Sequence, residues 1–226
     1  MSDALFITLE GTEGSGKTSQ GRALASALEA HGRGPTLLTR EPGGTDLGER
    51  VRHTLLALDG PRLDPLTQLL LLSAARAQLV HEVLRPALER GETVVCVRYS
   101  DSTRAYQGGG DGISDAAVES AISIATGGLE PDLTIYLDLD PREGIRRRER
   151  ARREGAVGAQ EGWNSFDERS IEFHYRVREA YLRVARENPS RVVVVDAARP
   201  FAAIHDEIMK IVLPRTVSDR VGGPRL

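Results

Sequence analysis

The feature that most constrains this chain is a glycine-rich segment close to its N-terminus. It follows the apolar run Leu5–Leu9 and reads Gly11-Thr12-Glu13-Gly14-Ser15-Gly16-Lys17-Thr18, which fits the pattern G-x-x-x-x-G-K-[ST]. Glycines let such a backbone turn so tightly that its N–H groups point inward at phosphate oxygens, and the following helix adds the positive end of its dipole. Lys17 is a point charge for the outer phosphates, and the Thr18 hydroxyl can ligate Mg²⁺. The segment therefore predicts a bound nucleoside triphosphate.

The rest of the chain alternates short apolar runs with longer helical patterns, which is typical of an α/β fold built on a parallel sheet. We expect strands at 5–9, 35–39, 93–97, 133–137 and 192–195, and helices at 18–31, 47–58, 66–88, 115–126, 141–153, 166–187 and 200–212. The run Thr93–Val97 is apolar throughout, as in a strand covered on both faces, and Ser114 is expected to cap the helix 115–126. The predicted organisation is one domain over residues 1–213, followed by a disordered tail at 214–226.

Composition excludes several classes of protein. The chain has 226 residues, of which 40% are apolar, so it can bury a sizeable core. A net charge of −3 argues against a dedicated nucleic-acid binder, which usually carries an excess of basic residues. No run approaches the roughly 18 apolar residues of a membrane span. The single cysteine, Cys96, excludes an intrachain disulfide and fits a cytoplasmic location. The five histidines lack metal-ligand spacing, so we expect ordinary packing or solvation for each.

Two arginines follow predicted strands and indicate a second anionic ligand. Arg40 comes directly after the second strand, and Arg98 directly after the third. Ligands of an open parallel sheet bind beyond the carboxyl ends of its strands, so both side chains should converge on the glycine-rich loop. The chain has no NKxD segment for guanine recognition. This arrangement favours a kinase in which a phosphate-bearing acceptor faces the triphosphate.

Several longer segments together resemble the bacterial thymidylate kinases. They occur in the order found in that family, between about Phe6 and Val212, and the segments are Thr39-Arg40-Glu41-Pro42-Gly43-Gly44-Thr45, Ala74-Ala75-Arg76-Ala77-Gln78, Arg98-Tyr99 through Ala105-Tyr106-Gln107-Gly108, Tyr136-Leu137-Asp138-Leu139-Asp140-Pro141, Phe173-His174-Tyr175-Arg176-Val177-Arg178 and Val195-Asp196-Ala197. The resemblance implies a P-loop NTPase fold, with a five-stranded parallel sheet flanked by helices and a small helical lid at about 142–166. It also implies the reaction ATP + dTMP → ADP + dTDP with Mg²⁺, in a homodimer.

The resemblance also implies roles for individual residues. ATP would lie on Gly11–Thr18, with Lys17 catalytic and Thr18 on the metal. Glu13 would accept a hydrogen bond from the sugar 3′-hydroxyl of dTMP. The phosphate of dTMP would be held by Arg98 together with Arg40, Glu41 and Pro42. Arg76 would donate to thymine O4, and Tyr106 would fill the space that a ribose 2′-hydroxyl needs. The pocket would be completed by Leu72, Ser102, Thr103 and Gln107.

The catalytic arginine of the lid is expected on the basic helix 141–153. Some members of the family carry this arginine in the glycine-rich loop, at the position of Gly14, and here the lid must provide it. Arg147 matches best in position, and Arg150 lies three residues further along roughly the same face. The glycines of the following loop, Gly155, Gly158 and Gly162, would make the lid flexible. Adenine would rest near residues 197–200.

The chain departs from the family at three places. Val97 stands where an aspartate usually helps to place Mg²⁺, and valine cannot do so. Either Thr18, phosphates and water hold the metal, with help from Glu41 or Asp101, or catalysis is impaired. Leu72 stands where a phenylalanine usually stacks on thymine, so base selectivity could be looser. Asn164-Ser165 stands where an Asp-Arg pair usually ends the lid. Two alternatives stay open: a kinase for another deoxynucleoside monophosphate, and a nucleotide-binding protein that has lost turnover.

Overall fold

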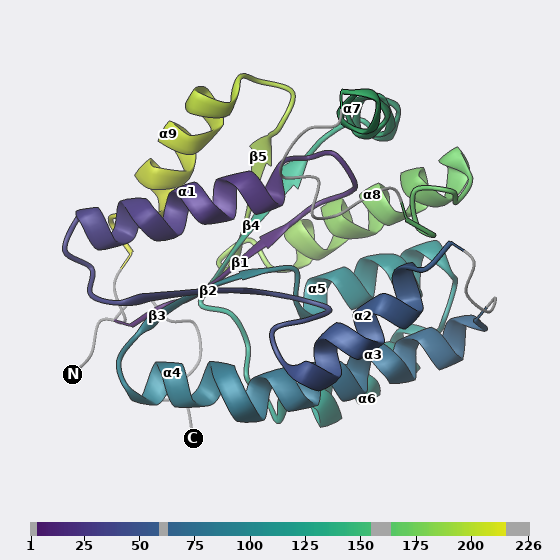
Figure 1. Ribbon diagram of the computed structural model, residues 1–226, viewed down its shortest axis with the longest axis horizontal. Helices are drawn as coiled ribbons and strands as arrows, with labels where there is room; N and C mark the ends of the chain where they lie inside the picture. The colour runs from purple at the N-terminus through teal and green to yellow at the C-terminus, as the bar shows by residue number, and fades with distance from the viewer. Residues whose placement is uncertain (1–3, 59–62, 155–163, 216–226) are drawn as a thin grey trace.

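Five parallel strands form the single sheet of the described structure (Figure 1). The computed structural model describes residues 4–58, 63–154 and 164–215. The strand order is β2-β3-β1-β4-β5, with bounds β1 Phe6–Glu10, β2 Thr36–Arg40, β3 Thr93–Val97, β4 Leu133–Asp138 and β5 Val192–Asp196. Every predicted strand is present, and every residue of β3 is buried, which confirms that both of its faces are covered. All five carboxyl ends therefore lie at one edge of the sheet.

Helices cover both faces of this sheet (Figure 1). On one face lie α1 (Lys17–Ala30) and α9 (Phe201–Val212). The other helical segments are α2 Asp46–Leu56, α3 Pro65–Leu79, η1 Val80–Leu84, α4 Arg85–Glu89, α5 Ser100–Thr103, η2 Arg104–Gly110, α6 Asp115–Thr126, α7 Pro141–Arg153 and α8 Ile171–Glu187. The predicted cap is also present, because the Ser114 side chain accepts a hydrogen bond from the backbone N–H of Ala117. This is the expected α/β architecture.

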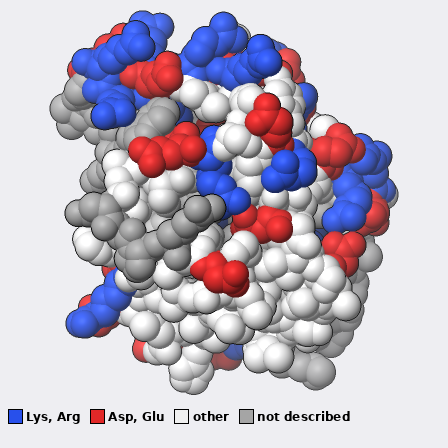
Figure 2. All heavy atoms as spheres, turned by 90° about the vertical axis from the view of Figure 1, so that its right-hand side faces the viewer, with Lys and Arg blue, Asp and Glu red and all other residues white. Residues whose placement is uncertain are grey.

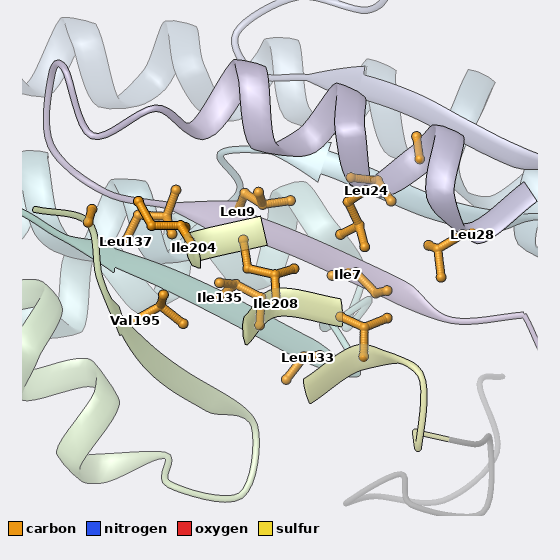
Figure 3. Close-up of a cluster of buried hydrophobic side chains, with 14 of the residues drawn as sticks. Ile7, Leu9, Leu24, Leu28, Leu133, Ile135, Leu137, Val195, Ile204 and Ile208 are labelled. Carbon is orange, nitrogen blue, oxygen red and sulfur yellow. The ribbon is translucent and has the colours of Figure 1, made fainter. Parts of the chain in front are cut away.

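The apolar core explains why α1 and α9 pack where they do. Leu24 and Leu28 lie four residues apart on α1 and are buried against the sheet, as periodicity predicts. Ile204 and Ile208 of α9 have the same spacing and reach the same cluster (Figure 3). Two aliphatic stripes thus fix α1 over the sheet, and with it the glycine-rich loop that precedes it.

The predicted helix 66–88 is present as the continuous run of α3, η1 and α4, in which η1 is one wider π-type turn. A second run, Ser100–Gly110, was not predicted, because consecutive glycines disfavour a helix. Its glycines serve packing instead, since a Cβ on Gly110 would lie 2.5 Å from the ring of Phe173 on α8. The missing side chains let α8 approach the segment that follows β3.

The helix predicted over 166–187 begins later than expected, at Ile171, with Ser170 as its cap. The preceding residues form turns, because Asn164 and Asp167 bond to nearby backbone groups: Asn164 Oδ1 accepts from the N–H of Phe166 at 3.0 Å, and Asp167 Oδ2 accepts from the N–H of Asn164 at 2.9 Å. Such local bonds compete with a helix. The predicted loop glycines at 155, 158 and 162, and the predicted tail beyond Arg215, lie outside the described residues.

Candidate active site

The glycine-rich loop connects β1 to α1 at the carboxyl edge of the sheet. Gly14 and Gly16 have φ values of 71° and 90°, a left-handed conformation that other residues rarely adopt. The Lys17 ammonium donates to the Thr12 carbonyl at 2.6 Å and to Ser15 Oγ at 3.2 Å. The loop therefore has the geometry and the positive charge of a phosphate cradle.

The first turns of α7 pack directly on this loop. A Cβ on Gly14 would lie 2.3 Å from the Gly144 carbonyl oxygen, and a Cβ on Gly144 would lie 2.2 Å from the Glu13 carbonyl oxygen. The two glycines thus make a close backbone contact that no larger residue allows in this arrangement. An arginine at position 14 is excluded by the same contact, which agrees with the expectation that the lid supplies the catalytic arginine.

One cavity of about 630 Å³ opens beside the loop. Of the predicted ATP-binding residues, Glu13, Gly14, Gly16, Lys17 and Thr18 line it, whereas Gly11, Thr12 and Ser15 do not. The predicted acceptor residues all line it, namely Arg40, Glu41, Pro42, Leu72, Arg76, Arg98, Ser102, Thr103, Tyr106 and Gln107. The structure therefore brings both predicted nucleotide sites into one continuous space.

Arg98 lies at the centre of the charged part of the cavity. It has φ 69° and is the one non-glycine residue with positive φ in the described part of the chain, a strained conformation that is common at functional sites. Its guanidinium donates to Glu13 Oε1 at 3.1 Å and to the Tyr106 hydroxyl at 3.0 Å. Tyr106 donates in turn to the same Glu13 oxygen at 2.6 Å.

Glu13 is held as an anion in this cluster. Burial alone would raise the pKa of its carboxyl, but His174, Arg98 and Lys17 together outweigh burial and hold the pKa far below its ordinary value. Its Oε2 lies 3.3 Å from Nδ1 of His174. A buried carboxylate at this place can accept a hydrogen bond from a hydroxyl group of a ligand and repels a second anion.

Arg76 and Glu41 form a buried ion pair at the other end of the cavity. The Arg76 side chain is 2% exposed, and it donates to the two Glu41 oxygens at 2.7–3.1 Å and to the Tyr99 carbonyl at 3.0 Å. Burial would lower the pKa of Arg76, but Glu41 holds it above its ordinary value. Among the described residues, Arg76 Nη1 and Gln107 Nε2 find no hydrogen-bond partner although both are buried. Both residues line the cavity, and each carries a donor that no described protein atom satisfies.

The lid arginines divide into two groups. Arg147 lines the cavity and donates to the Ala197 carbonyl at 3.0 Å, in the region expected to hold adenine. Arg150 lies away from the cavity lining, with its side chain 79% exposed and paired with Glu154. Figure 2, which views the molecule from the right-hand side of Figure 1, shows Lys and Arg side chains gathered at the top, where α7 lies. The predicted catalytic role of Arg147 thus agrees with its position, whereas Arg150 would have to move to take part.

The structure also corrects the expected metal helpers. Val97 lines the cavity and offers no ligand. Asp101 does not compensate for it, because its carboxylate points to Arg104 and Arg191 outside the cavity. Glu41 lines the cavity but is neutralised by Arg76.

Sequence reasoning missed several lining residues. Leu55 and Leu56 come from the end of α2, Arg148 lies on α7, and Phe166 lies in the turns before α8. Phe166 packs edge-on against Tyr106, with ring centroids 5.7 Å apart. Ser165 Oγ donates to the Leu55 carbonyl at 2.6 Å, and Asp167 accepts from Arg148 at 2.7 Å. No local pattern could predict these contacts, because each joins segments that lie well apart in the chain, by 19 residues for Arg148 and Asp167 and by 110 for Ser165 and Leu55.

Comparison with known proteins agrees with this geometry. A sequence model of the family described as Thymidylate kinase matches residues 9–208. The chain belongs to the thymidylate kinase family. A thymidylate kinase of Deinococcus radiodurans is 48% identical over 215 residues, covering 95% of this chain and 99% of the relative. One from Roseiflexus castenholzii is 46% identical over 219 residues, covering 95% of each.

A solved structure gives the same result for the fold. The crystal structure of thymidylate kinase from Ehrlichia chaffeensis superposes with a TM-score of 0.72 at 33% identity, covering 92% of this chain and 98% of the other. The predicted P-loop NTPase fold is therefore confirmed, and with it the resemblance to the thymidylate kinases. None of the helices within the described residues is long and apolar enough to cross a membrane.

Proposed function

We propose that this chain transfers the γ-phosphoryl group of ATP to the phosphate of dTMP. The observation that carries the proposal is one shared cavity, lined both by a phosphate cradle and by Arg76 and Gln107, whose Nη1 and Nε2 are buried donors without a partner among the described residues. A pyrimidine base presents carbonyl oxygens to such donors, while unsatisfied donors reject ligands that cannot accept. Arg98, which lines the same cavity, suits a phosphate because its planar fork binds two oxygens at once.

The residues present fit ATP and also Mg²⁺. The loop glycines and Lys17 match the phosphates, and Thr18 lines the cavity with its hydroxyl available to a hard cation. Among the described lining residues, the carboxylates are Glu13 and Glu41, and each already has a cationic neighbour. Thr18, phosphate oxygens and water would therefore hold Mg²⁺, which when bound neutralises charge on the phosphates.

The chain's own residues would act by positioning and by charge. Lys17 and Arg147 would balance the charge of the group in transfer, and Arg98 would align the acceptor oxygen with it, because phosphoryl transfer depends mainly on alignment and electrostatic stabilisation. Glu13 would orient the sugar. The contact of α7 with the loop, through Gly144 and Gly14, keeps the lid arginine close to the phosphates.

The test is a coupled assay for ADP with dTMP, dUMP, dCMP and dGMP as acceptors. We expect turnover with dTMP in preference to the others. The chain has two lysines, which offers a matched pair of variants: Lys17→Met should abolish turnover, and exposed Lys210→Met should leave it unchanged. Failure to bind or phosphorylate dTMP would refute the proposal, and tight binding without turnover would establish the inactive alternative.

A homodimer in the cytoplasm is a further part of the proposal. Leu66 and Leu70 lie four residues apart on α3 and are 52% and 59% exposed, and Ile124 on neighbouring α6 is 84% exposed. Exposed apolar side chains that gather on adjacent helices suggest a surface for a second copy. Light scattering should give the dimer mass for the native chain, and Leu70→Asp should shift it toward the monomer. A monomeric native chain would refute this part alone.

A further inference from the structure

His174 occupies a buried position beside the acidic residue of the phosphate cradle. Its side chain is 2% exposed, and Nδ1 lies 3.3 Å from Glu13 Oε2. Within the described part of the chain, neither this oxygen nor His174 Nε2 has a hydrogen-bond partner of good geometry. Polar atoms that are buried this deeply normally find partners. The pair therefore differs from a histidine that merely fills space.

The two oxygens of Glu13 have different surroundings. Oε1 accepts from the Tyr106 hydroxyl and from Arg98, which fixes that side of the carboxylate. Oε2 is buried beside His174, while Glu13 as a residue lines the cavity. The imidazole therefore holds the buried oxygen of Glu13, and through it the orientation of the whole carboxylate beside the cavity.

Packing explains how a residue of α8 reaches the loop. A Cβ on Gly109 would lie 2.4 Å from the Ala180 Cβ, and a Cβ on Gly110 would clash with Phe173. Because both positions are glycines, α8 approaches the segment after β3 closely enough to place His174 against Glu13. Phe173 covers the imidazole edge-on, with ring centroids 5.6 Å apart.

We propose that His174 is a positioning residue, which holds Glu13 Oε2 on the buried side and so fixes the carboxylate that orients the sugar 3′-hydroxyl of the acceptor nucleotide. A tautomer with the proton on Nδ1 would donate to Oε2 and leave Nε2 as an acceptor without a partner among the described residues. The inference rests on the proposed function, because it acts through the acceptor sugar. It assigns His174, for which the sequence indicated only ordinary packing, a part in choosing nucleotides that carry a 3′-hydroxyl.

The test compares two acceptors that differ in one hydroxyl, dTMP and 2′,3′-dideoxythymidine monophosphate. In His174→Phe, kcat/KM for dTMP should fall about tenfold, the range for one hydrogen bond to a charged group, while kcat/KM for the dideoxy acceptor stays unchanged. His174→Asn, whose amide nitrogen can replace Nδ1, should restore the discrimination. His205→Phe on α9 is the matched control, because its Nδ1 is also buried without a partner among the described residues but His205 does not line the cavity.

An equal fall for both acceptors, or no fall for either, would overturn the inference. A wild-type chain that ignores dTMP would instead refute the proposed function. A second measurement needs neither turnover nor a folded His174→Phe variant: the imidazole ¹⁵N resonances of His174 should change on Glu13→Gln substitution. An unchanged spectrum would overturn the inference by itself.

Discussion

Replacing Arg76 with lysine tests the base end of the cavity. The substitution keeps the positive charge beside Glu41 but loses the planar fork, which donates at once to Glu41 and the Tyr99 carbonyl and leaves Nη1 for a ligand. The lysine ammonium cannot donate to Glu41, the Tyr99 carbonyl and a ligand at the same time, and its shorter reach favours Glu41. The expected loss is therefore the bond to the base rather than the ion pair.

The magnitude follows from the charge on the donor. A hydrogen bond from a charged group contributes about 1.5–3 kcal/mol, so KM for dTMP should rise by roughly 10-fold to 100-fold. KM for ATP should hardly change, because the loop lies at the other end of the cavity. Arg76→Met is the poorer test, because it leaves the Glu41 carboxylate buried and unpaired and costs about 3–5 kcal/mol of folding free energy.

The assay is ADP release, with each nucleotide varied in turn and thermal denaturation measured on the same samples. Arg104→Lys is the matched control: Arg104 is 18% exposed and bonds to Asp101 and Glu119 outside the cavity lining. It should lose stability in a similar way without any change in KM for dTMP. A KM for dTMP within about twofold of the native value in Arg76→Lys would refute the placement of the base at Arg76.

Three further predictions follow from the site. Arg147→Ala should lower kcat by about a hundredfold or more, the scale for a charge that stabilises phosphoryl transfer, whereas Arg150→Ala, away from the cavity, should change kcat little; the reverse order in the same assay would show that the lid rearranges. Val97→Asp should lower the Mg²⁺ concentration that gives half-maximal activity in a metal titration. An unchanged concentration would show that position 97 does not reach the metal. Glu10 is buried and its pKa is raised to about 7, chiefly by burial and then by Asp101. Because the folded state prefers the protonated form, native stability should fall as pH rises from about 4.5 to 7, by about 3 kcal/mol relative to Glu10→Gln. If urea denaturation gives the same stability difference between the two proteins at pH 5 and at pH 7.5, this prediction is wrong.

The strands and most helices could be predicted because the pattern of apolar residues within each segment indicates its secondary structure. An unbroken apolar run such as Thr93–Val97 can only be a buried strand or a short buried helix, and its length favours the strand. The four-residue spacing of Leu24 and Leu28 similarly gives both the helix and its buried face. The loop was the easiest part, because the chemistry of phosphate binding demands glycines and a lysine at fixed spacing.

The start of α8 and the segment 100–110 could not be predicted, because tertiary contacts decide them. Glycines at 108–110 disfavour a helix locally, yet they are what permits the close approach of α8. Asn164 and Asp167 form the turns that precede α8, because their side chains accept from nearby backbone N–H groups, and Asp167 also accepts from Arg148 on the lid helix. Local propensity is overruled where a distant partner adds more free energy than the local preference removes.

The same reasoning explains why the residues of the site divide as they do. Lys17 belongs to a motif whose spacing carries its chemistry, Arg98 follows a predicted strand, and Arg76 lies in a segment that resembles the family, so the sequence predicted all three at the cavity. His174 and Phe166 reach the cavity region only because α8 and its preceding turns pack against the segment after β3, and nothing beside them in the chain announces that packing. A sequence motif identifies groups that lie close together in the chain, such as the amides of a phosphate loop. A residue that orients such a group from a distant helix can be identified only from the packing of the fold. The substitutions at His174 therefore test a role that no local motif predicts.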